Sequence, residues 1–308
     1  AVRHLTQPTL RARCQPRQAA RSGPGSRPRS GPRDAPAHLS GASRAIKAGD
    51  GRPDRRSSSR VQFPIDIDLG FVRVPAHLLL EVLAYTLGYR YYAALRRRGD
   101  PISDLARMWI FIGAVTGGLL GSRLLALLEH PEAWAATHSV PELLAGKTIV
   151  GGLLGGLIGV EWTKRRLGVR VSSGDLMVYP LLLGLMIGRV GCFMAGLGDG
   201  THGVASSLPW AIDLGDGVPR HPLPLYEIAF LGLLWLGLRR LQARVRLADG
   251  ALFKLWMVAY LGFRLAIELL KPEPRPWAGL SAIQLACVAG LLYYHRVWRK
   301  PHELVTPR

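Results

Sequence analysis

From residue 74 onward, long apolar runs alternate with short polar joints, and this alternation constrains the fold more than any other feature. A helix that crosses a membrane needs about 20 predominantly apolar residues. Seven segments approach that length, namely 76–95, 107–128, 147–163, 175–196, 223–241, 251–270 and 279–297. A soluble helical bundle is the alternative, but the runs 149–160 and 176–187 are apolar on every side, without a polar stripe. The sequence therefore predicts an all-α, polytopic membrane protein with seven transmembrane helices.

Lysine and arginine gather at every second joint, and this bias predicts the orientation. They follow the first, third, fifth and seventh segments as Arg96, Arg97, Arg98, Arg107; Lys164, Arg165, Arg166, Arg170; Arg239, Arg240, Arg244, Arg246; and Arg296, Arg299, Lys300. The intervening joints are poor in basic residues, with Lys147 after the second segment and Arg220 after the fourth. Because cytoplasmic loops carry the excess of Lys and Arg, we expect the N-terminus outside and the C-terminus in the cytoplasm.

Residues 1–60 differ from the rest of the chain. They contain 14 Lys and Arg against three Asp, and so contribute +11 of the net charge of +19. Rich in Arg, Pro, Ser and Gly, they cannot bury a core, and we expect a disordered basic tail. They lack the apolar region of a secretory signal and any nucleic-acid module, so no nucleic-acid partner is expected. An outside N-terminus would require this tail to be translocated, which suggests an extension of the gene prediction. The expected organisation is this tail, a membrane domain at 61–300 and a cytoplasmic tail at 301–308.

The stretch 188–203 contains the first candidate site. Arg189 stands near the end of a membrane segment, and a glycine-rich turn with Asp199 and His202 follows it. A charge at membrane depth costs about 3 kcal/mol or more, so a retained arginine is a functional candidate. The alternative is an arginine that snorkels to the interface. The small residues favour a site, because they let backbone N–H groups approach an anion.

Two further groups are expected at the same external depth. His221, Tyr226 and Glu227 open the segment 223–241, where Tyr226 also fits an interfacial aromatic belt and Glu227 needs a partner. Tyr260, Arg264 and Glu268 recur every four residues and therefore share one helix face. An internal pair between Arg264 and Glu268 is the alternative for these two residues.

The spacing of the glycines indicates close helix packing. The positions of the cysteines indicate neither a disulfide framework nor a metal site. Glycines at intervals of four in 107–128 and 147–163 predict close helix contact in lipid. The three cysteines, Cys14, Cys192 and Cys287, show neither a disulfide framework nor metal-ligand spacing. No metal and no cofactor are expected.

In this order the motifs resemble the bacterial prolipoprotein diacylglyceryl transferases. The resemblance covers nearly everything after residue 61. It rests on Phe63-Pro64, Gly117-Gly118 with Arg123, the Gly-Gly-Leu-rich third segment, Gly188-Arg189, His221-Pro222 with Leu225-Tyr226-Glu227, Tyr260 with Arg264 and Glu268, and Gly279-Leu280-Ser281 with Gln284.

The resemblance implies an enzyme of the bacterial inner membrane. The family moves a diacylglyceryl group from phosphatidylglycerol to the lipobox cysteine thiol of a prolipoprotein, and glycerol phosphate leaves. Its partners are phosphatidylglycerol, the prolipoprotein signal peptide and the lipid bilayer. Arg189 matches the signature arginine that contacts the head group, and Tyr260 and Arg264 match the tyrosine and arginine of the sixth helix.

The chain is a divergent member on this interpretation. Where the family has His-Gly-Gly-Leu with a catalytic histidine, this chain has Val150-Gly151-Gly152-Leu153 or, in another register, Leu154-Gly155-Gly156-Leu157. Cys192 and Ala195 stand at the signature's usual asparagines, and a usual tyrosine falls near Glu81.

The chemistry requires a thiolate and stabilisation of the departing phosphate. Arginine suits the phosphate because its fork matches the oxygens, which favours Arg189 and Arg264, with Arg123 third. His221, Glu227 and Asp199 remain open as the base, and His221 has the most suitable intrinsic pKa. The expected catalytic residues are His221, Arg264, Tyr260 and Glu227, and the expected substrate-binding residues are Arg189, Arg123, Asp199, Tyr226 and Gln284.

Other functions are a membrane transferase with a different acceptor and a non-catalytic phospholipid-binding relative. A transporter is disfavoured, because the halves of the chain show no internal repeat.

Overall fold

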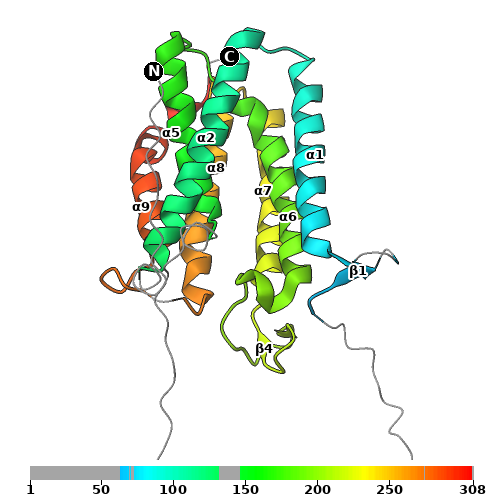
Figure 1. Cartoon of the computed structure of the whole chain (residues 1–308). Coiled ribbons are helices and arrows are strands. Elements are labelled where there is room, and N and C mark those ends of the chain that lie inside the picture. The colour runs from blue at the N-terminus through cyan, green and yellow to red at the C-terminus, as the bar shows by residue number, and fades with distance from the viewer. Residues whose placement is uncertain (1–62, 69, 71–72, 132–145, 274, 307–308) are drawn as a thin grey trace, which may run out of the picture. The chain divides into compact units, whose positions relative to one another are not determined.

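The computed structural model describes residues 63–68, 70, 73–131, 146–273 and 275–306. The expected tail at 1–60 lies outside these residues. The described part is predominantly α-helical (Figure 1). Its helices are α1 (Ala76–Arg96), α2 (Asp104–Glu129), α5 (Ile149–Leu167), α6 (Val178–Ala195), α7 (Leu223–Arg244), α8 (Ala251–Ile267), α9 (Ala282–Tyr293) and α10 (His295–Arg299). Each predicted segment therefore contains a helix, with ends that shift by a few residues, and the last segment is divided between α9 and α10.

Short elements complete these helices. The 3₁₀ turns are η1 (Asp175–Met177) before α6, η2 (Gly196–Asp199) after α6, η3 (Glu268–Leu270) after α8 and η4 (Pro301–Leu304) near the C-terminus. The antiparallel pairs are β1 (Asp66–Asp68) with β2 (Arg73–Pro75), and β3 (Ile212–Asp213) with β4 (Pro219–Arg220). Ile67 faces Val74 in the first pair, and Ile212 faces Arg220 in the second. Both hairpins lie at the end of the helices where α6 ends and α7 begins (Figure 1).

The last predicted segment, 279–297, is shorter and broken in the structure. Ser281 caps α9, and Gly279 before it has a φ of +81°, which only glycine adopts readily. The helix ends at Tyr293, and α10 follows after Tyr294. Local capping chemistry therefore sets the start of this helix.

Two helical stretches of the described residues are long and apolar enough to cross a membrane, namely Asp104–Glu129 and Asp175–Asp199. The helix Ala282–Tyr293 is apolar but shorter. Large apolar side chains also face outward on several helices, among them Leu120, Leu124, Ile158 and Leu233, each more than half exposed. An apolar outer surface of this kind suits lipid and not water. The fold is that of an all-α membrane protein.

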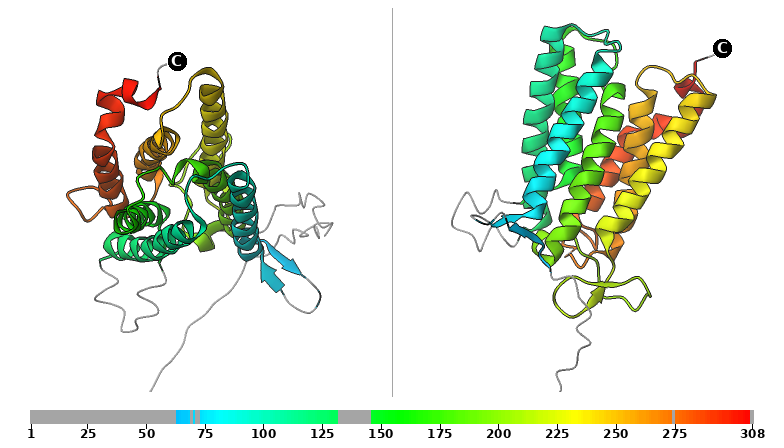
Figure 2. Two further views of the ribbon diagram at one scale, coloured as in Figure 1. Left: turned by 90° about the horizontal axis from the view of Figure 1, so that it is seen from above. Right: turned by 90° about the vertical axis from the view of Figure 1, so that its right-hand side faces the viewer.

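Glycine sets the closest helix contact, between α2 and α5, which lie side by side when viewed from above (Figure 2). A Cβ atom on Gly155 would come 2.8 Å from the Cα of Gly121 and would also meet the carbonyl oxygen of Gly117. Backbones can touch here because neither helix carries a side chain at these positions. The expectation that these glycines serve packing is confirmed.

Helix α8 is the most deeply buried element. Trp256, Met257, Tyr260 and Leu261 have no exposed surface. Helix α8 contacts α6, α7 and α9, so polar residues on it are removed from water on several sides. This position brings Arg264 to the functional site.

Candidate functional site

Glu227 is the centre of a buried charge cluster. It lies in the second turn of α7 and is 2% exposed. Its Oε1 accepts a hydrogen bond of 2.7 Å from the Tyr260 hydroxyl. Its Oε2 lies 2.8 Å from Arg189 Nε and 3.0 Å from Arg264 Nη1. Both carboxylate oxygens are thus occupied, and one carboxylate joins three helices.

Chain direction explains why these residues meet. Arg189 lies near the end of α6, Glu227 near the start of α7 and Arg264 near the end of α8. Neighbouring helices that run in opposite directions bring these three places to one end of the bundle. The interpretation of Arg189 as a snorkelling residue does not fit, because its side chain is 6% exposed and engaged by Glu227.

The charge cluster continues beyond Arg264. Arg264 Nη2 donates to Glu268 Oε2 at 3.1 Å, so the expected pair within the helix does form. Lys271 Nζ then lies 3.6 Å from Glu268 and 3.6 Å from Glu273. Arg264 therefore binds two carboxylates at once, one on η3 directly after its own helix and one on α7.

Arg189 and Arg264 differ in how much of the guanidinium is occupied. Arg264 uses Nη1 and Nη2 on carboxylates. Arg189 uses Nε on Glu227, while its Nη1 faces the Cys192 sulfur at 3.6 Å. Among the described residues, Arg189 Nη1 therefore faces a thiol, whereas both terminal nitrogens of Arg264 face carboxylates.

His221 belongs to a separate hydrogen-bonded group at the start of α7. Its Nδ1 lies 3.0 Å from the Tyr226 hydroxyl, which also accepts a bond of 2.7 Å from Trp210 Nε1. His221 is half-buried, and Tyr226 directly precedes Glu227. In the same loop, burial and then Arg220 lower the pKa of His202 below its usual value.

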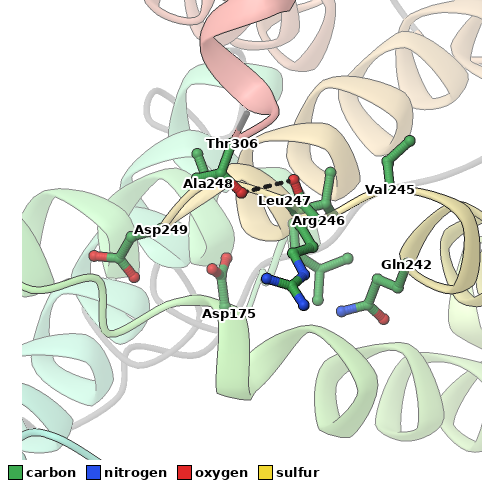
Figure 3. A pocket seen from close by; sticks show the side chains of 9 residues that line it. Asp175, Gln242, Val245, Arg246, Leu247, Ala248, Asp249 and Thr306 are labelled. Atoms are coloured by element: carbon green, nitrogen blue, oxygen red, sulfur yellow. Dashed lines mark hydrogen bonds between the residues drawn. The ribbon is translucent and has the colours of Figure 1, made fainter. Parts of the chain in front are cut away.

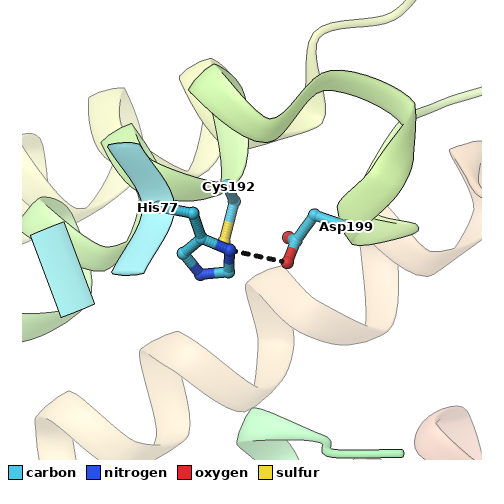
Figure 4. Close-up of side chains that lie close together, drawn as sticks. All are labelled: His77, Cys192 and Asp199. Atoms are coloured by element: carbon cyan, nitrogen blue, oxygen red, sulfur yellow. Dashed lines mark ion pairs between the residues drawn. The ribbon is translucent and has the colours of Figure 1, made fainter. Parts of the chain in front are cut away.

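Asp199 lies in a third group, which converges from two segments far apart in the sequence (Figure 4). His77 comes from the first turn of α1, Cys192 from the end of α6 and Asp199 from η2. His77 Nδ1 is 3.4 Å from Asp199 Oδ1, and the donor atoms of all three residues lie within 4.8 Å of one another. These donor types can also hold a metal ion. His77 was not among the residues expected from the sequence, although a histidine in the first turn of a predicted membrane helix was a usable signal.

Arg123 and Gln284 have other neighbours. Arg123 Nη1 donates to the Gly146 carbonyl oxygen at 2.7 Å, just before α5. Gln284 is 1% exposed and completes a capping box, because its Oε1 accepts from Ser281 N while its own N–H donates to Ser281 Oγ. The cap accounts for a buried glutamine at this position, so its expected contact with substrate stays a prediction.

The third predicted helix, which the structure describes as α5, holds apolar residues at the two positions that match the family's histidine. Val150 is 1% exposed beside Gly151, which packs on α2. Leu154, the alternative position, is half-buried and packs against the apolar core. Both positions hold apolar packing residues, and neither can accept a proton.

A hollow of about 560 Å³ lies at the other end of α7 (Figure 3). Asp175, Gln242, Arg246 and Thr306 are among its lining residues. Gln242 is about 22 Å along the helix from Glu227 at 1.5 Å per residue. This hollow is therefore distinct from the charge cluster. Beside it, Thr306 N donates to Arg246 O, so residues 301–306 contact the turn between α7 and α8.

The fold and the site define a class, an all-α membrane protein with a buried arginine–carboxylate cluster at one end of its helices. Residues 64–298 match the family described as prolipoprotein diacylglyceryl transferase. The chain belongs to this family, and it is a transferase.

Curated relatives carry the name phosphatidylglycerol–prolipoprotein diacylglyceryl transferase. One from Methylibium petroleiphilum is 30% identical over 72% of this chain and 88% of the relative. Another from Cupriavidus pinatubonensis is 29% identical over 72% of this chain and 83% of the relative. A third, from Pseudomonas paraeruginosa, is 29% identical over 74% of this chain and 90% of the relative. The resemblance found in the sequence is confirmed.

Proposed function

We propose that this protein transfers the diacylglyceryl group of phosphatidylglycerol to the lipobox cysteine of a prolipoprotein, the first step of lipoprotein maturation. The names of its relatives support the reaction and both substrates. The observation that carries the proposal within this chain is the pair of buried arginines on one carboxylate, Glu227. Two preorganised cations at one end of a membrane bundle suit a phospholipid phosphate.

Arg189 is the arginine that contacts the phosphate. Its Nη1 faces the Cys192 sulfur, and its guanidinium can present two parallel N–H groups to phosphate oxygens. Arg264 contacts the same oxygen of Glu227, Oε2, and adds its charge to the site. As the bond between glycerol carbon and phosphate oxygen breaks, negative charge grows on the phosphate, and fixed cations stabilise that charge.

Glu227 and Tyr260 have a positioning role. A carboxylate with both oxygens occupied accepts hydrogen bonds and is poorly placed to take a proton from a thiol. It holds the two guanidinium groups at a set separation, and the Tyr260 hydroxyl holds the carboxylate. This role differs from that of a base, which was one of the roles expected for Glu227 from the sequence.

The experiment is complementation followed by transfer in vitro. A bacterium depleted of its own transferase receives the chain, and lipidation of a marker prolipoprotein is measured. Purified Arg189→Lys protein should then transfer about 100-fold more slowly from phosphatidylglycerol to a lipobox peptide, since one lost preorganised donor costs about 3 kcal/mol. A lysine keeps the charge but not the two-pronged geometry.

The control is Arg240→Lys on the exposed basic end of α7, which should transfer at the wild-type rate. Normal transfer by Arg189→Lys and Arg189→Ala would contradict the phosphate role. A wild type that binds phosphatidylglycerol but transfers nothing to any lipobox peptide would favour the non-catalytic alternative. Transfer to a different thiol acceptor alone would favour the other transferase.

The topology is proposed with the function. Seven spans with the N-terminus outside and the C-terminus in the cytoplasm place the charge cluster in the outer half of a bacterial inner membrane, where a secreted precursor arrives. Cysteines introduced at Ser206 and Gln242 should react with membrane-impermeant reagents from outside and inside, respectively. The reverse labelling pattern would overturn this orientation. A chain of residues 61–308 should complement as well as the full chain.

A further inference from the structure

Transfer to a thiol requires a base, because the thiolate is the nucleophile. In this chain, the positions that match the family's histidine hold Val150 and Leu154. The base must therefore come from elsewhere in the fold. The following inference rests on the proposed function and assigns the residue that this reaction needs.

His77 and Asp199 lie within ion-pair distance of each other, an arrangement in which a carboxylate can orient an imidazole base. His77 Nδ1 lies 3.4 Å from Asp199 Oδ1, and the two side chains are 26% and 16% exposed. A carboxylate at one imidazole nitrogen directs the lone pair to the other nitrogen and stabilises the imidazolium when it forms. Nδ1 faces Asp199, so Nε2 is the atom that takes a proton.

The backbone of the signature stretch makes room for His77. A Cβ atom on Gly191 would lie 3.0 Å from His77 Cδ2 and 3.4 Å from His77 Cα. Glycine at this position therefore lets the start of α1 approach α6. The turn of α1 that carries His77 therefore lies close to the turn of α6 that carries Arg189 and Cys192.

Cys192 connects this dyad to the phosphate-binding arginine. Its sulfur lies 3.6 Å from Arg189 Nη1 and within 4.8 Å of the donor atoms of His77 and Asp199. A thiol next to this position would have a base on one side and a cation on the other. Such a cation also stabilises the thiolate.

The same three residues have donor types found in zinc sites, but the surroundings oppose a metal ion. The guanidinium of Arg189 lies 3.6 Å from the cysteine sulfur, which places one buried cation beside the position of another. Like charges at such a distance repel strongly where water is excluded. A proton on His77 adds a single positive charge at this place, and the Asp199 carboxylate at 3.4 Å balances that charge.

We propose that His77, oriented by Asp199, is the general base that deprotonates the lipobox thiol. The thiol proton moves to His77 Nε2 as the sulfur attacks the glycerol carbon. The carbon–sulfur bond forms, the carbon–oxygen bond to the phosphate breaks, and the electron pair leaves with glycerol phosphate. The proton then passes from His77 to the departing phosphate or to water, which returns the base to its neutral form.

The experiment measures glycerol phosphate release by the purified full chain, with phosphatidylglycerol and a lipobox peptide. His77→Ala should lower kcat by about 100-fold or more, the range for a lost general base, with KM for the lipid little changed. Imidazole added to His77→Ala should restore part of the rate, which a structural role would not allow. Asp199→Asn should lower kcat less than His77→Ala, because the histidine remains but loses its orientation.

His295→Ala, which removes an exposed histidine at the other end of the protein, is the matched control and should leave the rate unchanged. Unchanged transfer by His77→Ala would overturn the assignment of the base while the proposed function stands. The assignment also fails if His77→Ala loses its rate without rescue by imidazole, or if chelation abolishes wild-type transfer and Zn²⁺ restores it. A wild type that binds phosphatidylglycerol without any transfer would overturn both proposals.

Discussion

Two helix interfaces in this protein are held by different kinds of contact. Between α2 and α5, glycine backbones touch, as at Gly121 and Gly155. Among α6, α7 and α8, side chains of opposite charge meet, as at Arg189, Glu227 and Arg264. The first interface contains no charged side chain at these glycine contacts, whereas the second buries ionised side chains.

This difference indicates that the glycine interface serves packing and that the charged interface serves function. Lipid provides no hydrophobic force between helices, so small residues that allow close van der Waals contact are an efficient way to join them. A buried ion pair is a costly way, because desolvation offsets much of the attraction. Since glycine contacts suffice to join α2 to α5, helix packing alone does not explain the buried charges of Glu227 and its partners. Their presence therefore points to substrate chemistry.

The largest expected effect comes from Glu227→Gln at the charged interface. The amide can still accept from Tyr260 but removes the negative charge that Arg189 and Arg264 share, so that Arg264 keeps only Glu268 and Arg189 loses its carboxylate. Removal of one partner of a buried pair costs about 3–5 kcal/mol of unfolding free energy. Thermal unfolding in detergent should show this loss together with the loss of transfer. Wild-type stability would mean that the arginines are not held by this carboxylate.

Gly155→Ala tests the glycine interface with a control in the same helix. An added Cβ would clash with the α2 backbone, and overpacking of this kind costs about 1–3 kcal/mol. At Gly152 the nearest atoms to an added Cβ lie 3.8 Å away, so Gly152→Ala should be neutral. Equal unfolding temperatures for the two variants would show that backbone contact does not hold this pair.

The ion pair between Asp100 and Arg107 lies outside the charge cluster and allows the contribution of such a pair to stability to be measured separately. Burial raises the pKa of Asp100, but hydrogen bonds from Arg107 and from Ile102 N–H outweigh it and bring the pKa below its usual value. Asp100→Asn should cost about 2 kcal/mol at neutral pH, the range for a hydrogen bond to a charged group. Transfer should remain near normal.

The pH dependence of this pair follows from the sign of the shift. A lowered folded-state pKa adds stability that is present above the unfolded value of about 4 and is lost as the pH falls through the folded-state value. The difference in unfolding temperature between wild type and Asp100→Asn should therefore narrow below about pH 4. A difference that stays constant down to pH 2 would contradict the ionic role of Asp100.

The smallest expected effect is at the α9 cap. Ser281→Ala removes the acceptor for Gln284 N–H and should cost about 1 kcal/mol, as lost N-caps do. Gln284→Ala should destabilise by a similar amount, and transfer should fall only as the folded fraction falls. If Gln284→Ala lowers kcat or raises KM in fully folded protein, the substrate-binding prediction for Gln284 holds instead.

The sequence predicted the helices because their signals are local. The apolar run 107–128 and the helix Asp104–Glu129 agree within a few residues, since a long apolar stretch satisfies its own backbone hydrogen bonds as a helix. The four-residue spacing of Tyr260, Arg264 and Glu268 likewise placed these residues on one face before any fold was known. Ser281 and Gln284 also form a capping box that their three-residue spacing encodes.

Contacts between distant segments came only from the tertiary structure. The sequence contained Glu227 and both arginines, yet nothing in their spacing shows that one carboxylate engages both cations, because that depends on how α6, α7 and α8 run past one another. His77 is 122 positions from Asp199 in the sequence, and a gap of that length carries no periodic signal. Helix formation is decided by neighbours along the chain, whereas the pairing of a base with its carboxylate is decided by which helix ends the packing brings together.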